Sequence, residues 1–139
     1  MTPRESVTAE CRRRGLDVVV AGCVDLLDGT GWDEGLIIAL GGQAAPYVLS
    51  GSEGGASGYW PRVWAARGLL YAWADAAAPA IIRATSDDAW RVREMAAKVI
   101  ARYGVADALD AVVALRDDPV PRVRAAASRA VVTLTATGA

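Results

Sequence analysis

A column of side chains that recurs every 31 residues carries much of the basic chemistry in this sequence. Its members are Leu36, Arg67, Lys98 and Arg129. Guanidinium and ammonium groups bind carboxylates and phosphates, and Trp and Tyr side chains often anchor protein binding surfaces. We therefore expect a basic surface that binds an acidic peptide, another protein or phosphates. The residues predicted to form this partner-binding surface are Trp60, Trp64, Arg67, Tyr71, Arg91, Lys98, Arg102 and Arg129.

Two features of this surface have alternative interpretations. Trp64 is spaced from Trp60 and Arg67 so that it lies on the binding face of a helix, but a tryptophan at this spacing also fills cores. On the helix expected over 90–103, Glu94 lies among the basic residues of the polar face, as on an ordinary solvated helix. The sequence leaves both alternatives open.

The residue types argue against catalysis. The chain has no histidine, which is the commonest general base and a frequent metal ligand. The glycines at 51, 54, 55 and 58 lack the spacing, preceding strand and following lysine of a phosphate-binding loop. Cys11 and Cys23 are the only cysteines and form no zinc motif. We expect a protein that is not an enzyme and that holds no metal or cofactor.

Bulk properties predict a soluble chain. It has 139 residues, of which 53% are hydrophobic and 22% charged, and its net charge is -1. This balance argues against disorder. The first residues contain no apolar segment of a secretory signal, and no stretch approaches the ~18 apolar residues that span a bilayer. We expect a cytoplasmic protein without a membrane segment.

An internal repeat must position the basic column. Arg62, Arg93 and Arg124 coincide at the 31-residue offset, as do the alanine pairs at 65–66 and 96–97 with Ala127-Ser128. A fixed period of this size is typical of stacked helical units that cannot bury their apolar faces alone. Apolar positions at spacings of four, three and four predict a helix over 90–103 and another one period later. Between them a second type of helix is expected over 106–116, with its counterpart at 76–85, so each unit is a helical hairpin.

The first half repeats the same plan in a weaker form. Helices are expected over 33–40 and 17–27, and Thr2-Pro3-Arg4-Glu5 has the form of a capping box that starts another helix, closed by Gly15. Residues 50–58 are expected to be a flexible loop. We predict one domain over 1–139, with clear repeats at 59–135 and degenerate ones at 3–50.

The repeats resemble those of the HEAT-repeat family, specifically the short HEAT-like repeats also found in phycobilisome lyases. The passages that carry the resemblance are DDAWRVREMAAKVIARYGVADALDAVVAL and DDPVPRVRAAASRAVVTL. The resemblance implies an all-α, right-handed α-solenoid of about four stacked hairpins, with the second helix of each hairpin lining a concave surface. It also implies a structural ladder, in which Asp87 and Asp118 cap helices while Arg93 and Arg124 pair with aspartates of neighbouring turns.

These expectations converge on a non-enzymatic adaptor that binds a partner protein or acidic peptide on its concave face. The alternative is nucleic-acid binding or repair, because HEAT-like DNA glycosylases use a basic groove with tryptophans; an accessory role in bilin attachment is a third possibility. Apolar residues near Val131, Val132 and Leu134 also suggest end-to-end self-association.

Overall fold

The computed structural model describes residues 1–50 and 59–136, and these residues form helices and short 3-10 turns without any strand. The predicted all-α fold of helical hairpins is therefore confirmed. The chain divides into a first compact unit, residues 1–77, and a second unit that begins at Ala78. Apart from Ser50, the loop predicted at 50–58 lies outside the described residues. The single-domain organisation and the right-handed course of the whole array stay predictions.

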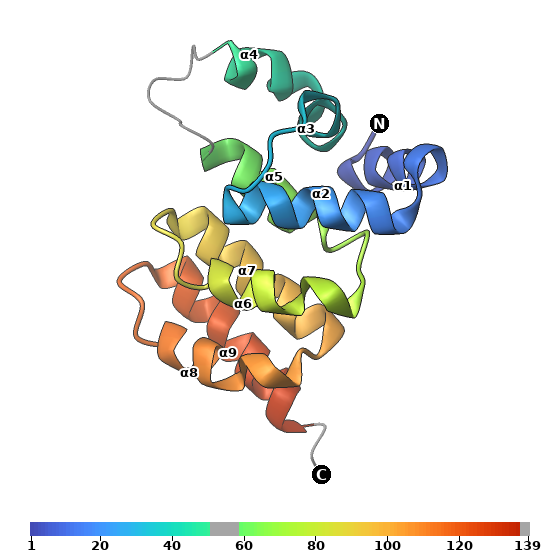
Figure 1. The fold of residues 1–139 in the computed structure, drawn as a ribbon. Helices are drawn as coiled ribbons and strands as arrows, with labels where there is room; N and C mark the ends of the chain where they lie inside the picture. Colours follow the sequence, from blue (N-terminus) through green and yellow to red (C-terminus); the bar gives the residue numbers. More distant parts are fainter. Residues whose placement is uncertain (51–58, 137–139) are drawn as a thin grey trace. The chain divides into compact units, whose positions relative to one another are not determined.

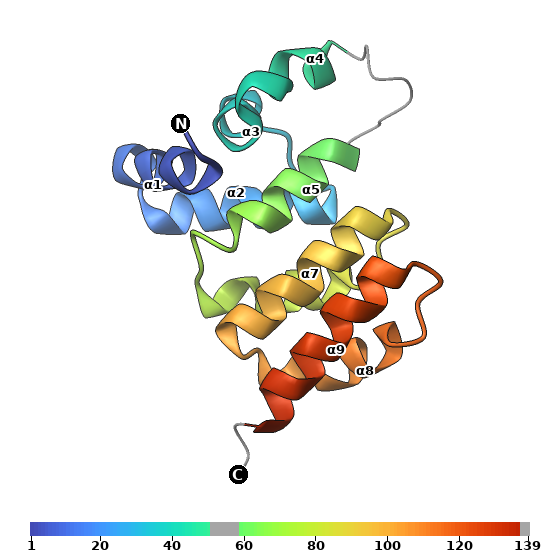
Figure 2. The ribbon, with the colours of Figure 1, turned by 180° about the vertical axis from the view of Figure 1, so that it is seen from behind.

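The second unit consists of two hairpins in two layers. Helices α7 and α9 lie side by side in one layer, and α6 and α8 form the other (Figures 1 and 2). Gly104 ends α7 in the left-handed conformation, with φ 60° and ψ 48°, which favours glycine. The elements of this unit are α6 (Ala78–Ala84), α7 (Trp90–Tyr103), the 3-10 helix η3 (Ala106–Ala108), α8 (Leu109–Leu115) and α9 (Pro121–Ala136).

Small apolar side chains form the core of the second unit. The predicted stripe of α7 is buried at Val92, Ala96 and Val99, and its counterparts one period later on α9 are buried as well. Ala97 is also fully buried, so the alanine pair lets helices approach closely, because a larger side chain would hold them apart.

The predicted polar ladder connects the two hairpins of the second unit. The Arg93 guanidinium donates to both carboxylate oxygens of Asp118, at 2.7 Å from Nε and 3.2 Å from Nη2, and Nη1 donates to the carbonyl oxygens of Asp87 and Asp88. One period later, Arg124 Nη1 donates to the Asp118 carbonyl oxygen at 2.8 Å. The pairing of an arginine with an aspartate of a neighbouring turn is thus confirmed for Arg93, whereas Arg124 bonds to the backbone of Asp118 and pairs with no carboxylate among the described residues.

The two aspartates of the ladder also cap their turns in the same way. The Asp87 carboxylate accepts from the Ala89 amide at 2.8 Å, and the Asp118 carboxylate accepts from the Val120 amide at 2.9 Å. Burial alone would raise the pKa of Asp118, but hydrogen bonds from Arg93 and the Val120 amide outweigh it and lower this pKa. The Asp118 carboxylate is therefore held in its charged form.

The first unit contains the shorter and less regular helices. The capping box is confirmed, since the Thr2 hydroxyl accepts from the Glu5 amide and the Glu5 carboxylate accepts from the Thr2 amide. Helix α2 packs against α5, and α3 packs against both α1 and α5. The elements are α1 (Pro3–Arg14), α2 (Leu16–Asp28), α3 (Glu34–Gly41), the 3-10 helix η1 (Gly42–Ala44), α4 (Ala45–Leu49), α5 (Tyr59–Gly68) and the 3-10 helix η2 (Asp75–Ala77).

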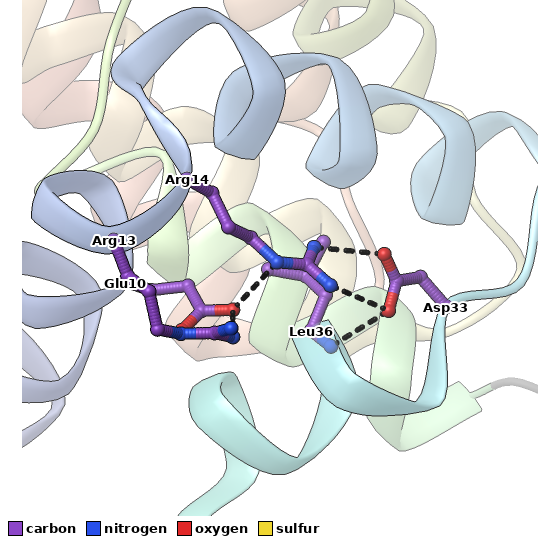
Figure 3. Close-up of polar contacts among 5 residues, drawn as sticks. All are labelled: Glu10, Arg13, Arg14, Asp33 and Leu36. Carbon is purple, nitrogen blue, oxygen red and sulfur yellow. Dashed lines mark hydrogen bonds and ion pairs between the residues drawn. The ribbon is translucent and has the colours of Figure 1, made fainter.

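An arginine–aspartate contact ties α1 to α3 (Figure 3). Arg14 forms an ion pair with Asp33 at 2.8 Å, and the other oxygen of Asp33 caps α3 by accepting from the Leu36 amide at 2.9 Å. The buried Glu10 carboxylate pairs with Arg14 at 3.0 Å and with Arg13 at 2.8 Å. Arg13 and Arg14 are therefore neutralised by acids of their own unit.

Close helix approach in the first unit depends on glycines. A Cβ atom built on Gly68 would lie 2.7 Å from Cδ2 of Leu40 and 3.3 Å from Sγ of Cys23. A Cβ on Gly41 would clash with the Trp64 ring. Cys23 is fully buried, and burial raises the pKa of its thiol to about 12. Glycine here fills the role that the paired alanines play in the second unit.

Candidate functional site

The aromatic side chains of α5 separate into a buried and a partly exposed set. Trp64 is only 5% exposed and packs over Gly41, so it fills the core, which is the second of the two roles that the sequence leaves open. Trp60 remains partly exposed, with its ring centroid 6.4 Å from that of Trp64 and 5.1 Å from that of Tyr59. Trp60 is thus accessible from solvent, whereas the neighbouring Trp64 ring is buried.

Arg67, in the last turn of α5, lines a cleft of about 730 Å³ in the first unit. Its Nη2 donates to the Leu40 carbonyl oxygen at 2.7 Å. This carbonyl belongs to the last turn of α3, where helix carbonyls lack intrahelical partners, so Arg67 caps that helix end. The remaining lining residues carry no charged side chain, and they are Met1, Pro3, Ser6, Leu40, Gly41, Gly42, Gln43 and Ala44.

The charge of Arg67 has no acidic counterpart in the described part of the chain. No ion pair is formed by this guanidinium among residues 1–50 and 59–136. Burial lowers the pKa of Arg67, although an arginine remains protonated at any physiological pH. A guanidinium has five N–H donors, and one of them is used at Leu40. Among the described residues, the cleft therefore presents a partly buried positive charge of which one N–H donor is used.

Tyr71 lies one turn beyond Arg67 and is partly exposed. The guanidinium carbon of Arg4 lies 5.5 Å from the centroid of its ring, within the range of a cation–π contact. Tyr71 is therefore occupied by α1 on one face of its ring.

In the second unit, Glu94 forms ion pairs with two basic residues. Its carboxylate pairs with Arg122 at 3.0 Å and with Lys98 at 3.7 Å. The sequence suggests a place for Glu94 on a solvated polar face, but this residue is only 6% exposed. Of the two alternatives that the sequence leaves open, the solvated polar face does not describe Glu94, because α9 packs against α7 and brings Arg122 to this carboxylate. Part of the predicted basic stripe is thereby neutralised.

The other basic residues of the second unit lie over aromatic rings or in solvent. Arg91 lies 4.4 Å from the Trp90 ring centroid, and Arg122 lies 5.2 Å from the same centroid. Arg102 is exposed, with its guanidinium carbon 5.7 Å from the Tyr103 centroid. Arg129 is exposed and lines a shallow groove on α9.

The four members of the 31-residue column therefore have four different environments. Leu36 is fully buried and belongs to the core of the first unit. Arg67 points into the cleft, Lys98 pairs with Glu94, and Arg129 faces solvent. Within each unit the period places side chains correctly on their helices, but the neighbours of each position decide whether its charge is available.

Sequence reasoning missed the exposed aromatic residue Trp32. Trp32 is 57% exposed and lines a second cleft of about 420 Å³, together with Pro61 and the glycines at 29 and 31. A signal was present, because Trp32 lies in the turn just before Asp33, where no helix can bury it. It is a second candidate contact for a partner in the first unit.

Two further features are absent from the described residues. Within 1–50 and 59–136, no group of three or more Cys, Asp or Glu side chains is arranged to hold a metal ion. In the same ranges, no helix is both long and apolar enough to cross a membrane.

Comparison with known proteins gives one match. A family model for HEAT repeats matches residues 57–131, more than half of the chain. No curated protein and no solved structure matches the sequence.

Proposed function

Because the chain belongs to the HEAT-repeat family, we propose that it is a non-enzymatic adaptor whose first unit holds an acidic segment of a partner protein against Arg67. HEAT repeats generally act as scaffolds for protein interactions. The observation that carries the proposal is the partly buried Arg67 guanidinium, which lines a cleft and has no acidic counterpart in the described part of the chain.

The chemistry of the cleft favours a carboxylate ligand. An Asp or Glu side chain that entered it would meet the N–H groups of Arg67 in a partly desolvated setting, where a charge-assisted hydrogen bond is strong. It would also relieve the cost of burying the Arg67 charge. The partly exposed Trp60 and the exposed Trp32 lie near the opposite end of α5 from Arg67, where they offer apolar contacts for other residues of the partner.

Peptide display on the immobilised chain tests this proposal, because random peptides stand in for the partner's acidic segment. Selected peptides should carry Asp or Glu beside apolar residues, and their dissociation constants are measured by fluorescence polarisation. Arg67→Gln should weaken binding at least ~10-fold, because the loss of one charged contact in a partly buried site exceeds ~1.4 kcal/mol. Arg12→Gln is the matched control, since Arg12 is an exposed arginine of the same unit.

A third variant separates charge from shape. Arg67→Lys keeps the positive charge but loses the fork that donates two parallel bonds to a carboxylate, so its affinity should lie between those of the wild type and Arg67→Gln. Thermal unfolding of each variant checks that the Leu40 contact is not needed for folding. Selected peptides without acidic residues, or peptides that bind Arg67→Gln and wild type equally, would refute the proposal.

Nucleic-acid binding and an accessory role in bilin attachment receive less support. Lys98 and Arg122 both pair with Glu94, so the second unit offers fewer free charges for phosphates than its sequence suggests.

A further inference from the structure

The outer face of α9 repeats the surface on which α7 receives the next hairpin. Glu94 and Ala97 of α7 are 6% and 0% exposed, whereas their counterparts one period later, Ala125 and Ser128, are exposed. Val132, the counterpart of Ala101, is 65% exposed. Glu94 and Ala97 are buried where α7 packs against α9, and Ala101 is half-buried. The same positions on α9 are small or apolar and uncovered.

The polar ladder also stops short at this face. In α7, Arg93 binds the two oxygens of the Asp118 carboxylate, which belongs to the turn before α9. Its counterpart Arg124 donates through Nη1 to the Asp118 carbonyl oxygen, as Arg93 does to Asp87. Among residues 1–50 and 59–136 no ion pair is formed by Arg124. The atoms equivalent to those that hold Asp118 are therefore able to receive another carboxylate.

A groove runs along this face of α9. It encloses about 400 Å³ and is lined by Ser128, Arg129, Val132 and Thr133. These residues follow helical spacing, so the groove lies along the helix rather than across it. Its size and direction suit the side chains of a second helix laid beside α9.

From these three observations we infer that the outer face of α9 docks a helical hairpin of another protein, one that presents an aspartate in the turn before its second helix. The aspartate would bind Arg124 as Asp118 binds Arg93, and the following helix would cover Ala125, Ser128 and Val132. This surface lies in the second unit and does not depend on Arg67.

Charge argues against a second copy of the chain as the occupant. Helix α9 carries three arginines and no acidic residue, so two copies of α9 face to face would oppose like charges. Helix α1 carries four arginines and two glutamates, and both Glu10 and Glu5 already have partners within the first unit. Head-to-tail stacking of α1 on α9 would therefore bring no free carboxylate of α1 to Arg124. A partner that brings an unpaired aspartate fits this face better than a second copy, whose Asp118 is already bound by its own Arg93.

The chain itself provides a probe of the right chemistry. A synthetic peptide with the sequence of residues 105–136 contains the α8–α9 hairpin and its Asp118 turn, which already pack on α7 in this manner. Titration of this peptide into the chain of 139 residues, followed by calorimetry and by the gain of helical circular dichroism, should show saturable binding of one peptide per chain.

Two substitutions and one control locate the binding. Val132→Glu should abolish binding, because it places a charge in the groove, whereas Val18→Glu should leave it unchanged, because Val18 is an equally isolated exposed valine of α2. Arg124→Ala in the chain, or Asp118→Asn in the peptide, should weaken binding at least ~10-fold, and the two changes together should weaken it no further than either alone.

Several results would overturn the inference. The first is the absence of saturable binding. The second is binding that Val132→Glu does not reduce, which is expected if the peptide displaces the native hairpin from α7. The third is dimerisation of the chain alone through α9 in sedimentation experiments. Arg67→Gln should not change the affinity for this peptide. A failure of the Arg67 proposal is therefore distinguishable from a failure here.

Discussion

The two units join helices by different means. In the second unit, contacts recur at the period of the sequence, because Arg93 and Arg124 donate to equivalent carbonyl oxygens and Asp87 and Asp118 accept from equivalent amides. The first unit contains contacts that do not recur in this way. The Arg14–Asp33 pair and the packing of Gly68 against Leu40 have no counterpart one period away among the described residues.

The difference shows what a regular repeat maintains. A ladder that binds both its own turn and the next one transmits the same geometry from hairpin to hairpin. In the first unit, individual side chains such as Arg14 and Asp33 hold the interfaces between helices. Clefts of about 730 and 420 Å³ lie among these helices.

The largest expected effect is that of breaking the ladder. Arg93→Ala should lower the free energy of unfolding by about 3 kcal/mol, because it leaves the Asp118 carboxylate buried without its cation. Arg124→Ala is the matched control and should cost only about 1 kcal/mol, since a single carbonyl bond is lost. Urea unfolding measures both. Equal costs for the two variants would show that the Arg93–Asp118 contact is not what distinguishes the ladder.

The corresponding test in the first unit concerns a glycine. Gly68→Ala should cost about 2 kcal/mol, because its Cβ would force Leu40 and Cys23 apart in a filled core. Gly35→Ala, also within a helix, meets its nearest atoms at 3.4 Å and should be neutral or slightly stabilising.

Alkylation of Cys23 provides the second measurement for this pair. The buried thiol should react slowly in the wild type and faster in Gly68→Ala, with no acceleration in Gly35→Ala. A Gly68→Ala variant as stable as Gly35→Ala would mean that the first unit is less tightly packed than its glycine contacts indicate.

A smaller effect is expected from the carboxylate that connects α7 and α9. Glu94→Gln should lower the free energy of unfolding by about 1 kcal/mol, because Arg122 is largely solvent-exposed and recovers water when its partner is neutral. Asp110→Asn, at an exposed acid of the same unit, should change stability by less than about 0.5 kcal/mol. Thermal unfolding compares the two. A loss of several kcal/mol would mean that Glu94 is a main support of the hairpin stack.

The smallest expected effect is the loss of folding stability at low pH. Hydrogen bonds from Arg14 lower the pKa of Asp33, and those from Arg93 and Val120 lower the pKa of Asp118 despite its burial. Both carboxylates therefore contribute stability above their unfolded pKa of about 3.9, and this contribution is lost as the pH falls through their folded pKa values. Unfolding free energies measured from pH 6 to pH 3 should decline, and less steeply in Asp33→Asn and Asp118→Asn. Unchanged slopes in both variants would contradict this account.

Much of the fold follows from the sequence, because the period is written in residues whose physical roles do not depend on distant neighbours. Alanine pairs, the Asp118 turn, Gly104 and the Thr2 capping box act locally or at a fixed offset, and each lies where its type predicts. The burial of Glu94 could not be foreseen in the same way. The sequence places Glu94 on a polar helix face, where solvation is expected, and its burial depends on the packing of α9, which brings Arg122 to its carboxylate.

The candidate site was only partly predictable for a related reason. The spacing puts Arg67, Lys98 and Arg129 in one column, but it contains no information about which of them meets a carboxylate. Trp64 illustrates the same point, since its burial depends on Gly41 of another helix. Availability for binding is a property of the neighbours, and in the first unit the repeat no longer specifies those neighbours.

The fork of Arg93 has a consequence for how such a chain can change. One guanidinium spans two turns at once, so deletion of a single residue from either turn would move its oxygen atoms by up to ~3.8 Å, out of hydrogen-bond reach. The amino-acid composition of these two turns can therefore change, whereas their length must stay the same. Insertions should therefore be tolerated only where no arginine side chain donates hydrogen bonds to two neighbouring turns.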